Sequence, residues 1–196
     1  KYSKSYLSMG VQGGFNNLKS EFGKTNPRDA DLYGTISNFN PNFGGGVYLR
    51  NEKYYVGVSV PYILNNKLVD VPDLPSQAQQ YRYYYAMAGM THKVSDKVKV
   101  LPSVLVRFQE QAPLSFDFTA ILALYDVVGI GASYRLGDSF VGMFELALNE
   151  NFHVGYAYDV TTSDISQYSN GSHELMINYR IKINKIHKGL ECPSYF

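Results

Sequence analysis

The sequence HELMINYRIKI, residues 173–183, alternates between two kinds of side chain from one position to the next. One phase is mainly apolar, and the other is polar or charged apart from one methionine. The apolar phase holds His173, Leu175, Ile177, Tyr179, Ile181 and Ile183, and the other phase holds Glu174, Met176, Asn178, Arg180 and Lys182. Successive side chains of a β-strand point to opposite faces of a sheet. The stretch therefore predicts a strand with one apolar face and one charged face.

The same alternation recurs along the chain, whereas helical periodicity is nearly absent. In residues 127–136, for example, Val128 and Ile130 share one phase, and Ser133 and Arg135 share the other. We expect ten strands, near residues 3–15, 43–51, 53–63, 81–93, 96–108, 113–125, 127–136, 139–149, 151–160 and 171–184. The pattern predicts an all-β chain with an antiparallel, up-and-down order of strands.

The composition suits strands that meet lipid on one side and water on the other. The chain has 18 Tyr, 11 Phe and 17 Gly, no Trp, and only 18% charged residues. No apolar run approaches the roughly 18 to 20 residues of a membrane-spanning helix. With 18 Lys and Arg against 17 Asp and Glu, the chain is almost neutral, which gives no electrostatic basis for binding nucleic acid. The single cysteine, Cys192, excludes an intramolecular disulfide.

The lengths of the connections favour a transmembrane barrel over a soluble β-sandwich, whose strands also alternate. The odd-numbered connections include all the long ones, at about residues 16–42, 64–80, 109–112, 137–138 and 161–170. The even-numbered connections are tight turns near residues 52, 94–95, 126 and 150. A meander places alternate connections at opposite ends, and outer-membrane barrels carry long external loops and short periplasmic turns. We therefore expect a transmembrane β-barrel over residues 1–184, in a bacterial outer membrane.

This orientation makes residues 185–196 a periplasmic C-terminal tail. Because the first strand then runs outward, a closed barrel with an even strand number requires an even number of further strands before residue 1. A barrel of ten strands that is complete in itself is the simpler alternative. Charges of both signs fall on the inward phase and predict a salt-bridged, hydrated interior: Arg107, Asp117, Arg135, Glu145, Asp159, Glu174, Arg180 and Lys182.

Catalytic and metal-binding patterns have little support. A Ser/His/Asp set drawn from Ser172, Asp159 and either His153 or His173 would make an outer-membrane hydrolase, but His173 falls on the apolar phase and no Gly-x-Ser-x-Gly elbow is present. The histidines lack close ligand spacing. We expect a non-enzymatic protein with no cofactor and no metal. The glycine run at residues 44–46 is expected to start a strand where backbones approach closely or bend.

Three segments of the chain resemble the PorP/SprF family. They are residues 42–64 (NFGGGVYLRNEKYYVGVSVPYIL), residues 113–135 (PLSFDFTAILALYDVVGIGASYR) and residues 151–180 (NFHVGYAYDVTTSDISQYSNGSHELMINYR). The order GYAYD, then YS-x-GSHE, is the most specific feature, and the ending CPSYF is similar to the terminal Pro-x-Tyr-Phe pattern of the family. The resemblance runs over essentially the whole chain.

The resemblance implies an outer-membrane protein of the type nine secretion and gliding machinery of Bacteroidota. It implies roughly four more strands before residue 1, so that the intact barrel has about fourteen. It also implies a role in the export or surface anchoring of cargo, such as adhesins that bear a C-terminal sorting domain. The implied partners are outer-membrane lipid, this cargo, and periplasmic ring or lipoprotein components of the system. A passive porin or channel is the first rival function, and the hydrolase is the second.

The loop over residues 161–172 is the candidate binding region. It is rich in Ser, Thr and Asp and has no apolar residues of its own to bury, apart from an isoleucine and a tyrosine, yet the family resemblance is densest there. We expect cargo or a plug to be received by Tyr168, Ser172 and Glu174, with Asp159 and Arg180 as inward-facing support. The alternative is that Tyr168 packs onto the barrel rim and the polar groups only satisfy the turn.

Overall fold

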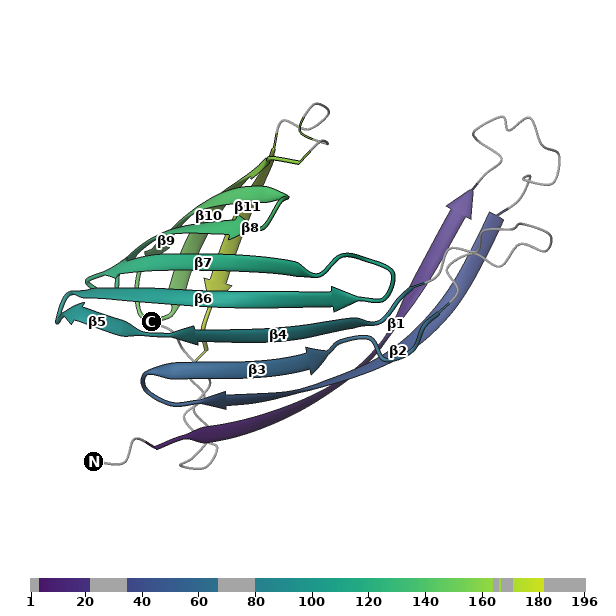
Figure 1. Ribbon diagram of the computed structural model, residues 1–196, viewed down its shortest axis with the longest axis horizontal. Helices are drawn as coiled ribbons and strands as arrows, with labels where there is room; N and C mark the ends of the chain where they lie inside the picture. Colours follow the sequence, from purple (N-terminus) through teal and green to yellow (C-terminus); the bar gives the residue numbers. More distant parts are fainter. Residues whose placement is uncertain (1–3, 22–34, 67–79, 164–165, 167–170, 182–196) are drawn as a thin grey trace. The chain divides into compact units, whose positions relative to one another are not determined.

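The computed structural model describes residues 4–21, 35–66, 80–163, 166 and 171–181, and this part of the chain holds eleven β-strands (Figure 1). Their bounds are β1 Tyr6–Glu21, β2 Thr35–Arg50, β3 Tyr54–Val60, β4 Tyr83–Met90, β5 His92–Ser95, β6 Val98–Gln109, β7 Ser115–Leu124, β8 Val128–Arg135, β9 Ser139–Ala147, β10 Phe152–Thr161 and β11 Ser172–Tyr179. Neighbouring strands of the sheet are hydrogen-bonded in the order β1-β2-β3-β4-β6-β7-β8-β9-β10-β11. The short strand β5 pairs with β6 and is not a member of this series. The predicted all-β antiparallel meander is confirmed.

Several expected boundaries are wrong, and two of the differences are large. The stretch predicted as one strand over residues 81–93 breaks at Thr91, whose backbone N–H donates to the carbonyl oxygen of Lys53 at 2.7 Å, so that β4 and β5 are separate. The predicted connection over residues 16–42 is strand at both ends, because β1 continues to Glu21 and β2 begins at Thr35. Asparagines favour turns in isolation, but here they belong to a continuous antiparallel ladder.

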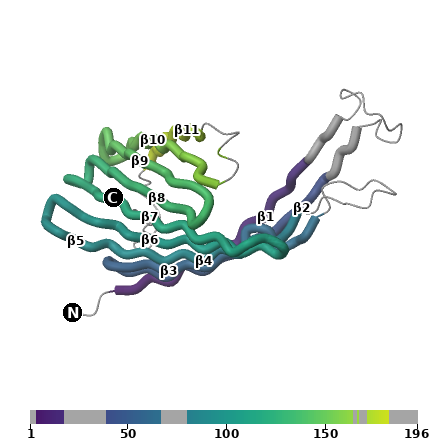
Figure 2. The backbone as a smooth tube through the Cα atoms, turned by 45° about the horizontal axis from the view of Figure 1, so that its top comes forward, coloured from purple at the N-terminus to yellow at the C-terminus, as the bar shows by residue number. Residues whose placement is uncertain are grey.

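The described residues divide into two compact units. Unit 1 comprises Lys1–Asn51, Val56–Met87 and Val106–Leu114, and unit 2 comprises Glu52–Tyr55, Ala88–Leu105 and Ser115–Phe196. Figure 2 follows the backbone of the same strands as a tube, coloured along the sequence. The final strand, predicted over residues 171–184, ends at Tyr179, so Arg180 and Ile181 are not part of it. Residues 182–184 and the predicted tail over residues 185–196 lie outside the described part of the chain.

In unit 1, β1 and β2 form one long hairpin with an apolar and a polar face. The register pairs Leu7 with Leu49 and Met9 with Val47, which makes one face apolar. The opposite face carries Gln12, Asn16, Asn40 and Asn42 among glycines, and the last two are buried.

Asn42 holds the segment after β3 against β2. Its side-chain Oδ1 accepts hydrogen bonds from the backbone N–H groups of Phe43 at 2.9 Å and Leu64 at 3.1 Å, and its Nδ2 donates to the carbonyl oxygen of Leu64 at 2.9 Å. A Cβ atom added at Gly44 would lie 2.7 Å from the carbonyl carbon of Pro61, so the backbones approach too closely for any other residue. The predicted close approach at the glycine run is confirmed, although Gly44 lies within β2 and does not begin it.

In unit 2, the registers of β7 to β11 sort the side chains onto two faces. One face, here called the polar face, carries Asp117, Thr119, Ser133, Arg135, Ser139, Glu145, His153, Asp159, Ser172 and Glu174. The other, here called the apolar face, carries Phe118, Leu122, Ile130, Tyr134, Phe140, Phe144, Tyr156, Val160, Leu175, Ile177 and Tyr179. The predicted assignment of side chains to the two faces is therefore correct for residues 127–136 and 173–179. Five of the eight charged residues that were predicted to point inward lie on the polar face.

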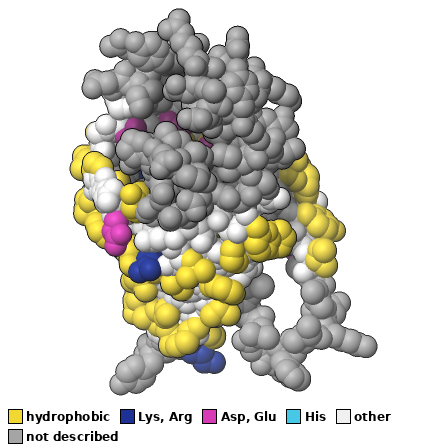
Figure 3. Space-filling model, turned by 90° about the vertical axis from the view of Figure 1, so that its right-hand side faces the viewer, with side chains coloured by type: hydrophobic (Ala, Val, Ile, Leu, Met, Phe, Trp, Pro, Cys, Tyr) yellow, Lys and Arg dark blue, Asp and Glu magenta, His cyan; other side chains and the backbone are white. Residues whose placement is uncertain are grey.

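The burial of these faces is the reverse of that of a soluble protein. Ser139 and His153 on the polar face are each only 3% exposed, whereas Phe140 and Tyr156 on the apolar face of the same two strands are 49% and 45% exposed. Both faces of β11 are exposed. In the view of Figure 3, exposed hydrophobic side chains form extended patches with few charged side chains among them. A soluble domain buries its apolar face, so this apolar face requires an apolar surrounding.

Candidate functional site

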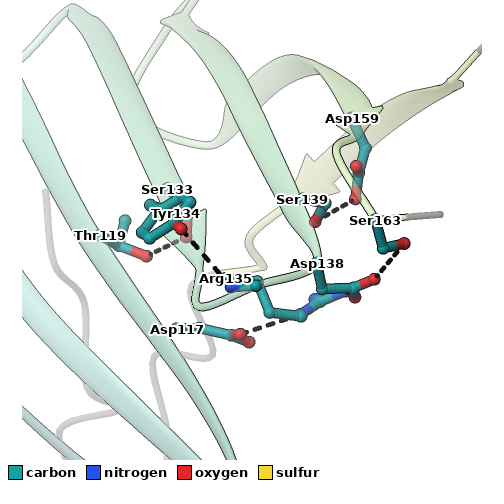
Figure 4. Close-up of polar contacts among 10 residues, drawn as sticks. Asp117, Thr119, Ser133, Tyr134, Arg135, Asp138, Ser139, Asp159 and Ser163 are labelled. Atoms are coloured by element: carbon teal, nitrogen blue, oxygen red, sulfur yellow. Dashed lines mark hydrogen bonds and ion pairs between the residues drawn. The ribbon is translucent and has the colours of Figure 1, made fainter. Parts of the chain in front are cut away.

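A polar cluster lies where β7 begins and β8 ends, on the polar face of unit 2 (Figure 4). The guanidinium of Arg135 donates from Nε to Oδ1 of Asp117 at 2.9 Å and from Nη1 to Oδ2 of Asp138 at 3.2 Å. Thr119 and Ser133 form a hydroxyl pair at 2.7 Å one step further along the same face. The arginine thus joins the two strands to the turn that follows β8.

The loop after β10 is attached to this turn at its start. The carbonyl oxygen of Asp138 accepts hydrogen bonds from the backbone N–H groups of Thr162 at 2.7 Å and Ser163 at 3.2 Å. The Ser163 hydroxyl also donates to Oδ1 of Asp138 at 3.3 Å (Figure 4). Gly137 permits the turn because its φ of 72° is in the left-handed region. The beginning of the candidate loop is therefore fixed to the sheet.

The end of the loop is fixed by a glycine. Gly171 has a φ of 85°, and a Cβ atom added there would lie 2.5 Å from the carbonyl oxygen of Asp159 and 3.0 Å from the hydroxyl of Tyr158. A side chain at this position is excluded by both the conformation and the space. Gly171 therefore lies directly against β10 before Ser172 begins β11.

The structure brings three of the five expected site residues together. Asp159 and Ser172 are register partners on the polar face, and Glu174 follows on the same face opposite Ala157. The carboxylate of Asp159 accepts a hydrogen bond from the Ser139 hydroxyl at 3.4 Å (Figure 4).

The other two expected residues are not part of this group. Arg180 follows the far end of β11, where its backbone N–H donates to the carbonyl oxygen of Asn151 in the β9–β10 turn at 2.7 Å. At about 3.3 Å per residue, the eight-residue length of β11 places Arg180 roughly 25 Å from Ser172. Tyr168 lies outside the described residues.

A cavity of about 240 Å³ lies beside Glu174 in unit 2. Its floor is formed by small residues of neighbouring strands, including Gly129, Gly131, Gly155 and Ala157, and Met143, Met176, Glu145 and Glu174 also line it. Sequence reasoning placed the two glutamates on the inward phase but missed the cavity between them. The sequence signal for the cavity was the pair of glycines at alternate positions of β8, Gly129 and Gly131. Their contribution to the cavity becomes evident only from the registers of β8 with β9 and of β9 with β10.

The histidines do not support hydrolysis. His173 lies on the apolar face, opposite in phase to Ser172, and its Nδ1 atom is 2.6 Å from the Tyr156 hydroxyl. Asp159 is the register partner of Ser172, and the buried His153 lies six residues before Asp159 in β10. The Nδ1 atom of His153 is 3.4 Å from Oε1 of Glu145. Neither imidazole is therefore placed to activate the Ser172 hydroxyl.

No three His, Cys, Asp or Glu side chains in the described part of the chain are grouped as a metal site requires. None of the described residues forms a helix that is long and apolar enough to cross a membrane.

A meandering antiparallel sheet whose apolar face is exposed, and whose polar face is the less exposed one over β7 to β10, is typical of a membrane protein of the β class. The chain belongs to the PorP/SprF family, because the model of the family described as type IX secretion system membrane protein PorP/SprF matches residues 1–179. No curated protein matches the sequence. The resemblance noted in the sequence is thus confirmed, and the chain is a membrane component of the type IX secretion system.

Proposed function

We propose that the chain forms part of a closed β-barrel in the bacterial outer membrane, with the apolar face of unit 2 toward lipid. Strand lengths support this placement, because β7 and β10 have ten residues each, β9 has nine, and β8 and β11 have eight each. A transmembrane strand needs about 9 to 11 residues. The long connections then face outside the cell, and residues 185–196 form a periplasmic tail.

The intact barrel has about fourteen strands. β1 and β11 end the hydrogen-bonded order, so each has one edge without a strand neighbour on that path. A strand edge exposed to lipid leaves backbone N–H and C=O groups unsatisfied, which is strongly unfavourable. Further strands between β11 and β1 close the barrel and satisfy both edges. This proposal extends the ten-strand path by about four strands, in keeping with the length implied by the family resemblance.

The function of the barrel is to help export cargo or anchor it at the cell surface, including adhesins with a C-terminal sorting domain. The observation that carries this proposal is the cavity beside Glu174 on the polar face, close to a loop fixed at both ends. Its small-residue floor leaves room for a polypeptide segment, and Glu145 and Glu174 favour a segment that bears a cation. Periplasmic ring or lipoprotein components of the secretion system are the proposed partners.

Cargo display and barrel abundance together test the site. We expect Glu174→Gln and Glu145→Gln to leave the amount of folded protein in the outer membrane unchanged and to reduce surface display of cargo. Tyr168→Ala tests the remaining loop residue in the same assay. Glu150→Gln, in the short turn before β10, is the matched control and should alter neither quantity. Normal display in both cavity variants would refute the cargo site.

A passive channel is the second candidate function, favoured by the charges of both signs on the polar face. Conductance of the purified, intact protein in planar bilayers separates the two functions. A steady open pore without cargo would favour the channel. Conductance that appears only in the cavity variants, or only after cargo peptides are added, would favour the secretion role.

A further inference from the structure

Unit 1 contains an apolar groove of about 540 Å³, which spans four neighbouring strands of the sheet order. The residues that line it are Gly45, Gly46, Val47, Val58, Ser59, Val60, Tyr84, Tyr85, Ala86, Val106 and Phe108. The volume is within the range of about 300 to 1,000 Å³ that small-molecule sites occupy. We call it the β2–β6 groove.

The groove opens on the apolar side of unit 1. Val47 is the register partner of Met9 on the apolar face of the β1–β2 hairpin, and both are exposed. Val58 is also exposed, and the rings of Tyr84 and Phe108 contact one another with centroids 5.8 Å apart. Gly45 has no side chain and Ala86 has only a methyl group, so these two positions leave the depression between the larger neighbours.

A cation is fixed at one end of this groove. The Arg82 guanidinium donates from Nη1 to the hydroxyl of the groove residue Tyr84 at 3.1 Å and from Nε to the carbonyl oxygen of Ile63 at 2.8 Å. Guanidinium has five N–H donors, so these two bonds orient the group and leave donors for a further acceptor. Its planar fork matches the geometry of a phosphate.

We propose that the β2–β6 groove binds a membrane lipid, with an acyl chain along the groove and the lipid phosphate on Arg82. Arg82 directly precedes β4, so in the proposed barrel it lies near one end of a membrane-spanning strand, where lipid headgroups are found. The groove is continuous with an exposed apolar surface, which makes an acyl chain the occupant that fits the rest of its surroundings. The proposal rests on the membrane location of the chain and not on its cargo role.

Native mass spectrometry of the intact protein in detergent tests this proposal, with dioleoyl phosphatidylglycerol as the anionic probe and dioleoyl phosphatidylcholine as the zwitterionic one. We expect Arg82→Gln to weaken phosphatidylglycerol binding by about threefold to tenfold, because a charge-assisted hydrogen bond is lost. Arg50→Gln is the matched control, since Arg50 lies at the end of β2 over the Tyr6 ring and outside the groove.

Filling the groove provides an independent test. Ala86 is exposed, so Ala86→Phe should fold and should lower the binding of both lipids, whereas Ala132→Phe on the apolar face of unit 2 should lower neither. Heat-modified migration on gels verifies folding of each variant. Phosphatidylglycerol binding that is equal in the wild type, Arg82→Gln and Ala86→Phe would overturn the proposal. Because the assay contains no cargo, its outcome does not depend on the secretion role.

Discussion

Arg135 and Asp117 are register partners at the loop end of β8 and β7, and their side chains form an ion pair with Nε 2.9 Å from Oδ1. The Asp117 side chain is only 12% exposed, so the Arg135 guanidinium supplies a counter-charge to a largely buried carboxylate. Arg135→Ala should lower the free energy of unfolding by about 1 to 2 kcal/mol, between the values of exposed and fully buried pairs. Urea unfolding in detergent measures this change. A double-mutant cycle with Asp117→Asn that gives no coupling energy would contradict the assigned pairing.

The two phases of β11 should respond differently to a positive charge. Ile177 lies on the exposed apolar face, whereas Met176 lines the cavity on the polar face. Ile177→Arg should reduce the yield of folded protein in the membrane, because a cation toward mid-bilayer lipid costs about 2 to 4 kcal/mol. Met176→Arg, the neighbouring control, should be milder. Equal yields of the two variants would show that the assignment of faces is wrong.

Gly44 should be more sensitive to alanine than Gly14, which lies on the paired strand. A Cβ atom at Gly44 would meet the backbone of Pro61, whereas one at Gly14 has no neighbour within 4 Å. We expect Gly44→Ala to destabilise the fold by about 1 to 3 kcal/mol through overpacking against rigid backbone. Gly14→Ala should have little effect in the same urea titration. Similar midpoints for both variants would rule out the close approach.

The proposed orientation can be tested by thiol labelling of whole cells. Because β1 extends to Glu21 and β2 begins at Thr35, single cysteines belong in residues 24–32 and 68–78. In a Cys192→Ser background, these sites should react with a membrane-impermeant maleimide, whereas cysteines at Glu52 and Glu150 should react only after lysis. Labelling of the short turns in intact cells would reverse the orientation.

Much of the fold follows from local sequence, because period-two alternation identifies a strand and its faces without knowledge of its neighbours. Residues 173–179 are a clear example, since every predicted phase agrees with the register to β10. The beginning of β2 was missed because asparagines at positions 40 and 42 look like turn residues until the buried hydrogen bonds of Asn42 are known.

The site was predictable only in part. Asp159, Ser172 and Glu174 were expected together, and the register places them on the same face of two adjacent strands, whereas their role as a binding site stays a prediction. Arg180 was grouped with them because it falls on the same alternating positions of the sequence. It lies beyond the far end of β11 and is therefore distant from the other three residues. The contribution of Asp138 was missed, since its bonds to Thr162 and Ser163 depend on a contact between two different connections.

The most direct test of a membrane sheet with a polar inner face is a nitroxide scan along β11, residues 172–179, in the intact protein reconstituted in bilayers. Collisional accessibility to oxygen reports lipid, and accessibility to a water-soluble nickel chelate reports water. Labels at Leu175, Ile177 and Tyr179 should favour oxygen, and labels at Glu174, Met176 and Asn178 should favour the chelate. Accessibilities that do not alternate, or that alternate in the opposite phase, would contradict the account.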